Sequence, residues 1–128
     1  MKHTLGIDIV EIKRLEKLCR KWGKGFLRKV YTAKELAYSK SRRYPYQHLA
    51  ARFAAKEAIF KALGEVETDF VGWKNVEILN DVHGRPVVHW HGEADVCRKR
   101  RGIRRAVVSL SHTDNYAVAS ALLMYSKR

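Results

Sequence analysis

The chain has 128 residues, which is about the length of one domain and is enough to enclose a hydrophobic core. It carries 26 lysines and arginines against 13 acidic residues, a formal net charge of +13, so we expect an anionic partner: nucleic acid, a phosphorylated small molecule, an acidic protein or an anionic membrane surface. Two cysteines without metal-ligand spacing exclude a disulfide framework, and the absence of a secretory signal or an apolar run of membrane-spanning length leads us to expect a cytoplasmic protein.

A strand is expected at the start of the chain. Residues 5–10 are apolar and β-branched except for Asp8, a composition typical of a strand. Asp8 has two interpretations. Strand alternation puts it opposite Ile7 and Ile9, which is consistent with a solvent-facing side chain. Alternatively it meets Glu57 from a later helix, and the two form a carboxylate pair of the kind with which proteins hold magnesium.

Residues 11–22 have helical periodicity with charge gathered on one side. Within about a third of the circumference lie five cations: Lys13, Arg14, Lys17, Arg20 and Lys21. The opposite side is expected to be apolar and consists of Ile12, Leu15, Leu18, Cys19 and Trp22. The basic stripe, which Lys24, Arg28 and Lys29 extend, is either an ordinary solvated face or a docking surface. Because Glu16 is the only acidic residue inside this helix, we favour an acidic partner.

Two further helices are predicted before the middle of the chain. Thr32-Ala33-Lys34-Glu35 has the form of a capping box, so a short helix should follow it to about Tyr38. The polar, basic residues 39–46 are a predicted loop. Pro45 suits the first turn of a long helix that ends at Leu63, and Gly64 suits its C-terminal cap.

The predicted helix 45–63 carries charges among residues that are otherwise apolar or alanine. Lys56, Glu57 and Lys61 lie in surroundings that predict burial, where an unpaired charge is costly and usually has a ligand or a catalytic task. Glu57 and Lys61 are one turn apart on the same face. They are either an exposed i,i+4 ion pair or a metal-binding carboxylate beside a cation that suits a diphosphate.

The second half of the chain is predicted to be mostly strands. Its expected elements are, in order, strands at 73–79 and 86–90, a helix at 92–100, and strands at 106–111 and 116–123. Each strand pair reads as a hairpin, with the second turn at Thr113-Asp114-Asn115. Since no repeat, low-complexity tract or linker interrupts the chain, we expect residues 1–128 to form a single α+β domain with mainly antiparallel strands.

Two polar clusters in this half remain open to two interpretations. The basic cluster, which is Arg98, Lys99, Arg100, Arg101, Arg104 and Arg105, is either a nucleic-acid patch or a solubilising helix end. His112 follows Ser109 and Ser111 at a predicted strand end and is either structural or, with Thr113, part of a phosphate site. The sequence contains no P-loop, dinucleotide fingerprint or Ser-His-Asp signature.

Four segments taken together resemble the holo-acyl-carrier-protein synthase family of 4′-phosphopantetheinyl transferases. They are residues 6–12 (Gly-Ile-Asp-Ile-Val-Glu-Ile), residues 31–36 (Tyr-Thr-Ala-Lys-Glu-Leu), residues 52–58 (Arg-Phe-Ala-Ala-Lys-Glu-Ala) with 61–64 (Lys-Ala-Leu-Gly), and residues 109–113 (Ser-Leu-Ser-His-Thr). They occur in the family's order and span nearly the whole chain. The resemblance implies that family's fold, an antiparallel sheet with a long central helix, in a homotrimer with active sites between subunits. Lys56 would then be an interface residue.

The resemblance also implies an activity: transfer of the 4′-phosphopantetheine arm of coenzyme A to a serine of apo acyl carrier protein, which releases adenosine 3′,5′-bisphosphate and supports fatty acid biosynthesis. It implies Mg²⁺, or alternatively Mn²⁺, on Asp8 and Glu57, with Lys61 on the diphosphate. The base that takes the serine proton would be Glu57 or a metal-ordered water. The residues implied at the nucleotide end of coenzyme A are Arg52, Gly84, Arg85, Pro86, His112 and Thr113. The acidic carrier protein would dock on the basic stripe, Arg28 included.

Two alternatives compete with this interpretation. A related transferase could serve the carrier domains of polyketide or peptide synthetases, but the short chain favours the small homotrimeric type. A nucleic-acid-binding module would explain the +13 charge and the basic cluster. It leaves Asp8, Glu57 and Lys61 without a task, so we expect neither a nucleic-acid nor a membrane partner.

Overall fold

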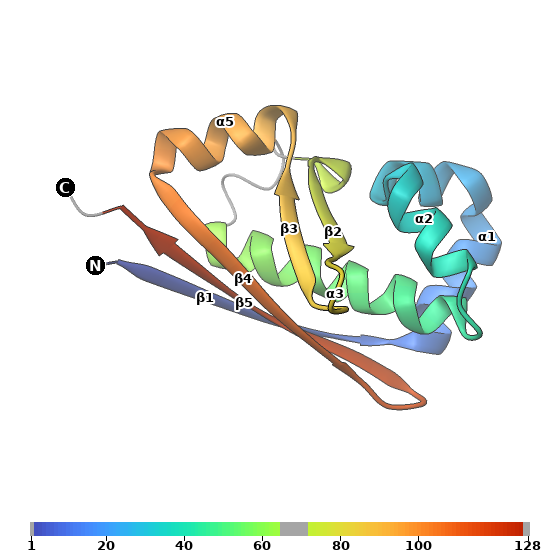
Figure 1. Cartoon of the computed structure of the whole chain (residues 1–128). Helices are drawn as coiled ribbons and strands as arrows, with labels where there is room; N and C mark the ends of the chain where they lie inside the picture. The colour runs from blue at the N-terminus through green and yellow to red at the C-terminus, as the bar shows by residue number, and fades with distance from the viewer. Residues whose placement is uncertain (1, 65–71, 127–128) are drawn as a thin grey trace.

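The computed structural model describes residues 2–64 and 72–126 as an α+β arrangement built around one long helix (Figure 1). The elements follow one another as β1 (His3–Glu11), α1 (Ile12–Val30), α2 (Ala33–Lys40), α3 (Pro45–Leu63), the 3₁₀ helix η1 (Trp73–Asn75), β2 (Val76–Asn80), β3 (Pro86–Trp90), α5 (Gly92–Arg101), β4 (Ile103–His112) and β5 (Tyr116–Tyr125). Strands β1, β5 and β4 form an antiparallel sheet in that order, and β2 pairs with β3. In Figure 1, α3 runs along one face of the larger sheet, with α1 and α2 gathered beyond one end.

The sequence explains why β1 can lie directly against α3. A Cβ atom on Gly6 would stand 1.9 Å from the carbonyl oxygen of Ala58, a distance that real Cβ atoms do not reach. Alanines fill this face of α3, and Ala54, Ala55 and Ala58 are fully buried. Small residues on both elements therefore let two backbones touch, which brings the middle of β1 next to the middle of α3.

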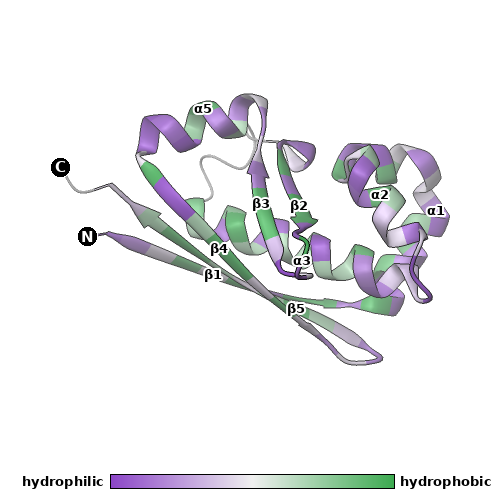
Figure 2. Ribbon diagram, in the orientation of Figure 1, coloured by the Kyte–Doolittle hydropathy of each residue, from purple (hydrophilic) through white to green (hydrophobic). Residues whose placement is uncertain are grey.

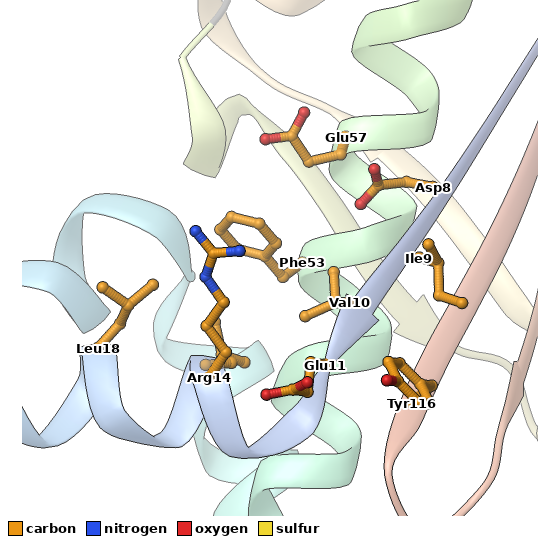
Figure 3. A pocket seen from close by; sticks show the side chains of 10 residues that line it. Asp8, Ile9, Val10, Glu11, Arg14, Leu18, Phe53, Glu57 and Tyr116 are labelled. Carbon is orange, nitrogen blue, oxygen red and sulfur yellow. The ribbon is translucent and has the colours of Figure 1, made fainter.

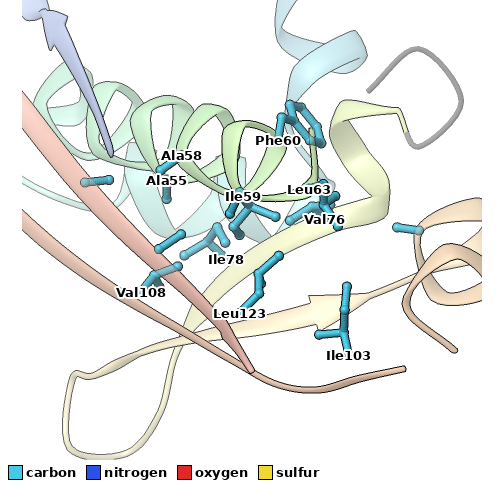
Figure 4. Packing of buried hydrophobic residues seen from close by; sticks show 14 of the residues in the cluster. Ala55, Ala58, Ile59, Phe60, Leu63, Val76, Ile78, Ile103, Val108 and Leu123 are labelled. Atoms are coloured by element: carbon cyan, nitrogen blue, oxygen red, sulfur yellow. The ribbon is translucent and has the colours of Figure 1, made fainter. Parts of the chain in front are cut away.

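The core lies on both sides of α3. Figure 4 shows one cluster, in which Ile59 and Leu63 of α3 meet Val76 and Ile78 of β2 and Leu123 of β5. A second cluster joins α3 to α1 through buried aliphatic side chains such as Leu15 and Leu49. Figure 2 shows the corresponding pattern, with hydrophobic residues along β5 and hydrophilic residues over much of α5. No helix in the described ranges is long and apolar enough to cross a bilayer.

Most predicted elements are confirmed, with differences at their ends. The long helix has the predicted bounds, and Thr32 and Glu35 make both hydrogen bonds of the capping box. The segment predicted to begin as a strand at Trp73 instead begins as the 3₁₀ helix η1, in which the Trp73 carbonyl accepts from the Val76 backbone N–H. The same carbonyl also accepts a hydrogen bond from the Lys56 ammonium, 3.0 Å away. The first helix extends to Val30 through a kink at Gly23, which has a positive φ of 59°.

Two side chains stand out against the sequence pattern. Trp22 lies on the apolar side of the first helix but is 61% exposed. The kink at Gly23 ends the straight apolar stripe there, and Phe26 beyond the kink takes the place against Phe53, with ring centroids 6.4 Å apart. Lys56 was expected at a subunit interface, but it is fully buried inside this one chain and paired with Glu35.

Candidate active site

A pocket of about 560 Å³ opens where β1, α1 and α3 meet, and it contains both carboxylates of the predicted metal pair. In Figure 3 the side chains of Asp8, from β1, and Glu57, from α3, project into the same opening. The close contact of β1 with α3 at Gly6 produces this arrangement, since Asp8 is the next residue on the same face of the strand.

The solvent-facing interpretation of Asp8 is wrong. The residues on either side of it, Ile7 and Ile9, are exposed at 64% each, while only 16% of the Asp8 side chain is accessible. Asp8 thus lies on the face of β1 that packs on α3. An acidic residue there is unusual for packing alone, which supports the interpretation that it has a ligand.

Lys61 reaches across to β1. Its ammonium donates to Asp8 Oδ1 and to the Ile7 carbonyl, both at 3.0 Å. The ion pair of this lysine is therefore with the strand and not the simple i,i+4 pair with Glu57 along the helix. The contact places a cation directly beside the two carboxylates, while more than half of the Lys61 side chain stays accessible to a ligand.

Electrostatics in the pocket favour an added cation. Burial raises the pKa of Glu57, the neighbouring charge of Asp8 raises it further, and Lys61 acts in the opposite direction. Two carboxylates that repel each other in a partly desolvated pocket are an oxygen donor set suited to Mg²⁺. Within residues 2–64 and 72–126 no group of three or more His, Cys, Asp or Glu gathers to hold a metal, so further ligands would have to come from a substrate or from water.

The rest of the pocket wall includes two aromatic residues, Phe53 and Tyr116, that the sequence did not single out as functional. Phe53 lies one turn before Glu57, and Tyr116 comes from the start of β5, while Arg14 and Leu18 of α1 complete the opposite side (Figure 3). Helical spacing relates Phe53 to Glu57 and could have identified it. Tyr116 has no such signal, because only the pairing of β5 with β1 brings it to the pocket.

A second pocket, of about 570 Å³, lies between the end of α2, α3 and the β2–β3 turn, and Arg52 and Gly84 both line it. Arg52 is buried, and its guanidinium stands 4.3 Å from the ring centre of Tyr38 and donates to Asn80 Oδ1 at 3.2 Å. Its Nε has no partner, and burial lowers the pKa of the group. Arg42 lines the same pocket, so two guanidinium groups face it, a composition that suits an anion; we call it the anion pocket.

The remaining predicted nucleotide contacts do not line this pocket. Arg85 and Pro86 follow Gly84 at the β2–β3 turn, where the Arg85 backbone N–H donates to Asp81. His112 and Thr113 are exposed at the tip of the β4–β5 hairpin, and the Thr113 hydroxyl accepts from the backbone of the same turn. Their assignment stays a prediction.

The six predicted docking cations are all exposed along α1. These are Lys13, Arg14, Lys17, Arg20, Lys21 and Arg28. Because Arg14 also lines the carboxylate pocket, the stripe starts at that pocket and leads away from it. Glu16 offers Arg20 an exposed ion pair at 3.7 Å, which is weak compensation for so many like charges.

The basic cluster at the end of α5 has local partners that favour the helix-end interpretation. Arg98 and Lys99 both pair with Asp95 one turn earlier. Arg101 donates to the Leu63 carbonyl at the end of α3. The first two contacts lie within α5, and the third joins α5 to α3.

Comparison with known proteins gives one consistent result. The family model of the 4′-phosphopantetheinyl transferase superfamily matches residues 4–121. A holo-[acyl-carrier-protein] synthase from Syntrophus aciditrophicus is 44% identical over 123 residues, 96% of each chain. The ACPS–CoA complex from Chronobacterium ammoniagenes superposes with a TM-score of 0.87 at 30% identity, over 99% of this chain and 100% of that one. The synthase from Neisseria meningitidis gives a TM-score of 0.83 at 30% identity, over 94% and 97%.

Proposed function

The chain belongs to the 4′-phosphopantetheinyl transferase superfamily, and we propose which of its residues bind the metal, coenzyme A and the carrier. The chain is a phosphopantetheinyl transferase: it transfers the 4′-phosphopantetheine arm of coenzyme A to a serine of apo acyl carrier protein and leaves adenosine 3′,5′-bisphosphate. The observation that carries the assignment of residues is the pocket that Asp8 and Glu57 both line, with the Lys61 ammonium 3.0 Å from Asp8 Oδ1.

Asp8 and Glu57 would hold Mg²⁺, and the diphosphate of coenzyme A would supply further oxygen ligands. When bound, the ion would neutralise charge on the diphosphate as the bond to the leaving phosphate breaks. The mutual repulsion of the two carboxylates in a partly desolvated pocket supports this assignment.

Lys61 and Glu57 divide the remaining chemistry. The serine hydroxyl of the carrier attacks the phosphorus that bears the pantetheine arm, and the bond from this phosphorus to the rest of the diphosphate breaks. Lys61, accessible beside Asp8, would turn its ammonium to the diphosphate and stabilise the leaving phosphate. Glu57, or a water that the ion orders, would accept the serine proton.

The second pocket would hold the nucleotide end of coenzyme A. Arg52 offers an unpartnered buried Nε, and Arg42 adds a second cation. Arg85, Pro86, His112 and Thr113 remain proposed contacts to the same nucleotide, the last two from the exposed tip of the β4–β5 hairpin, where they would serve a neighbouring subunit.

A trimeric assembly of this single domain is supported by the outer face of the larger sheet. Leu5, Ile7 and Ile9 of β1 are exposed there. Leu5 lies in register with Leu122 of β5, which in turn lies in register with Val107 of β4. An apolar row across three strands is a surface that a further copy of the chain would cover.

The carrier would dock on the basic stripe of α1, whose start at Arg14 leads the bound carrier toward the carboxylate pocket.

The direct test is to incubate the protein with apo acyl carrier protein, coenzyme A and Mg²⁺ and to weigh the carrier. We expect a gain of one phosphopantetheine, lost with EDTA and in Asp8→Ala. A carrier mass that stays constant with every metal and carrier tried would refute the transferase assignment. Transfer only to synthetase carrier domains would change the client, and full activity of Asp8→Ala would refute the metal site.

A further inference from the structure

The ion pair between Lys56 and Glu35 lies entirely inside the protein. The Lys56 ammonium donates to Glu35 Oε1 at 2.8 Å, to the Val76 carbonyl at 2.7 Å and to the Trp73 carbonyl at 3.0 Å. All three of its protons are thus used, and neither side chain is accessible to solvent. Burial lowers the pKa of Lys56, and Glu35 acts against that shift.

The pair substitutes for a missing strand. Strand β2 pairs with β3 on one edge. On the other edge, Glu35 Oε2 accepts from the Ile78 backbone N–H at 2.9 Å, and Lys56 donates to the Val76 carbonyl. Backbone groups that would otherwise be buried without partners are satisfied by one side chain from α2 and one from α3. The position of β2 relative to both helices therefore depends on this pair.

Contacts of the pair extend toward the carboxylate pocket. Lys56 holds the carbonyl of Trp73, and the Trp73 ring stacks on Phe53 with centroids 5.0 Å apart and planes inclined by 20°. Phe53 lines the pocket beside Glu57. The buried Lys56 ammonium thus helps to fix the position of Trp73, and Trp73 in turn packs against Phe53 in the pocket wall.

Contacts also extend toward the anion pocket. Tyr38 lies on the same helix as Glu35, one turn later, and Asn80 lies on the same strand as Ile78, on the same side of the strand. Asn80 donates to the Tyr38 hydroxyl at 2.8 Å and accepts from Arg52 at 3.2 Å. The elements that Lys56 and Glu35 hold together are therefore the same elements that orient Arg52.

We infer that Lys56 and Glu35 are positioning residues of the transferase, which set the two ends of the coenzyme A site relative to each other. The inference rests on the proposed function of the two pockets. Stability alone is a poor explanation, because apolar residues in place of a buried ion pair are often equally or more stabilising. What apolar residues cannot do is hold the Trp73 and Val76 carbonyls at fixed positions.

The test compares Lys56→Met, Glu35→Gln and the double variant with wild type. Lys99→Met, which removes an exposed ion pair with Asp95, is the control. For each protein we would measure the urea midpoint, the dissociation constant for coenzyme A by calorimetry, and KM for coenzyme A and for the carrier.

We expect folded Lys56→Met to bind coenzyme A about tenfold or more weakly, with KM for coenzyme A raised by a similar factor and KM for the carrier within about twofold of wild type. The double variant should recover part of the lost midpoint, because no buried charge is left alone, but should not recover the affinity. Lys99→Met should match wild type in all four measurements.

A lower midpoint with coenzyme A affinity and both KM values within twofold of wild type would overturn the inference and leave the pair a purely structural one. Recovery of affinity together with the midpoint in the double variant would overturn it as well. If Lys56→Met does not fold, the same criteria apply to Glu35→Gln, which keeps an acceptor for the Ile78 N–H. A wild-type protein that fails to bind coenzyme A would instead refute the proposed function.

Discussion

As long as no cation is bound between them, the neighbouring carboxylates of Asp8 and Glu57 lower the stability of the folded protein. They share a pocket in which burial and mutual repulsion disfavour the charged form of Glu57. Lys61 offsets the cost at Asp8 by an ion pair at 3.0 Å. Charges arranged in this way favour ligand binding over stability, a common conflict at active sites.

Replacement of Glu57 by glutamine should therefore stabilise the metal-free protein while it abolishes transfer. The folded-state pKa of Glu57 lies above its ordinary value, so the folded state binds its proton more tightly than the unfolded state. Stability of wild type must then fall as pH rises from the ordinary glutamate pKa through the raised one. Glu57→Gln lacks this loss, so its advantage should appear above that window and vanish below it.

Thermal unfolding at several pH values, with EDTA present, measures this difference. The variant should have the higher Tm above the window and the same Tm as wild type below it. A Glu57→Gln protein that is less stable than wild type above the window, or equally more stable at every pH, would contradict the assignment of the shift to burial and Asp8.

At the scale of elements, the site depends on the contact between β1 and α3. The backbone of β1 can lie against α3 only because Gly6 has no side chain. The same contact buries the alanines of α3 and sets Asp8 beside Glu57. Close packing and site geometry thus have one origin.

Gly6→Ala should destabilise the protein severely, because its methyl group would overlap the Ala58 carbonyl, a backbone atom that cannot turn aside. We expect a loss of about 3 kcal/mol or more in urea denaturation, together with loss of coenzyme A binding. Gly25→Ala in α1 is the control: its added methyl group meets open space, so this change should be neutral or stabilising by up to about 1 kcal/mol. Equal stability of the two variants would show that β1 can move off α3 without cost.

Local signals were sufficient to predict most helices and strands. The Thr32–Glu35 capping box and the Pro45 and Gly64 ends of α3 depend on neighbouring residues, and the structure confirms them. The sequence could not reveal the partner of Lys56, because Glu35 lies 21 positions away on another helix. The periodicity of the first helix also could not show that Trp22 is exposed, because the kink at Gly23, the next residue, interrupts the apolar stripe.

The orientation of Asp8 was ambiguous in the sequence for a different physical reason. Alternation tells which residues share a face of a strand but not which face is covered. Here Gly6 and Asp8 face the covering helix, and the larger Ile7 and Ile9 face outward. The rule that apolar residues point inward fails here, because this strand carries its large apolar residues on the exposed face.

The positive charge of helix α1 is expected to attract the acidic carrier. Reversal at two exposed positions outside the carboxylate pocket, Lys13→Glu with Lys17→Glu, should raise KM for the acidic carrier by about tenfold or more at low salt and leave KM for coenzyme A nearly unchanged. The difference from wild type should shrink as salt is added, because the Debye length falls from about 10 Å at 0.1 M to about 3 Å at 1 M. The matched control is Arg104→Glu with Arg105→Glu, which reverses two exposed charges on β4. A similar rise in KM in that control would mean that overall charge, and not the α1 surface, attracts the carrier.

At the scale of the whole molecule, two surfaces differ in composition and suit partners of different kinds. The basic stripe of α1 is polar and suits a partner that binds and leaves. The outer face of the β1–β5–β4 sheet is apolar and suits a permanent contact. The exposed hairpin tip with His112 and Thr113 belongs to the same sheet, so an assembly through this face would carry the tip toward a neighbouring copy.

Leu5→Glu should break this assembly without unfolding the subunit. Leu5 is 72% exposed in the single chain, so the charge costs little there, but it would be buried without a partner in any sheet-mediated contact. Sedimentation should give a mass of about three times 14.8 kDa for wild type and one chain mass for the variant at micromolar concentration. Val96→Glu on α5, another exposed apolar residue, should remain assembled. If active sites form between subunits, the Leu5→Glu monomer keeps its far-ultraviolet circular dichroism but loses transfer activity. An assembled Leu5→Glu protein would place the interface elsewhere, whereas a fully active monomer would show that one chain contains the complete site.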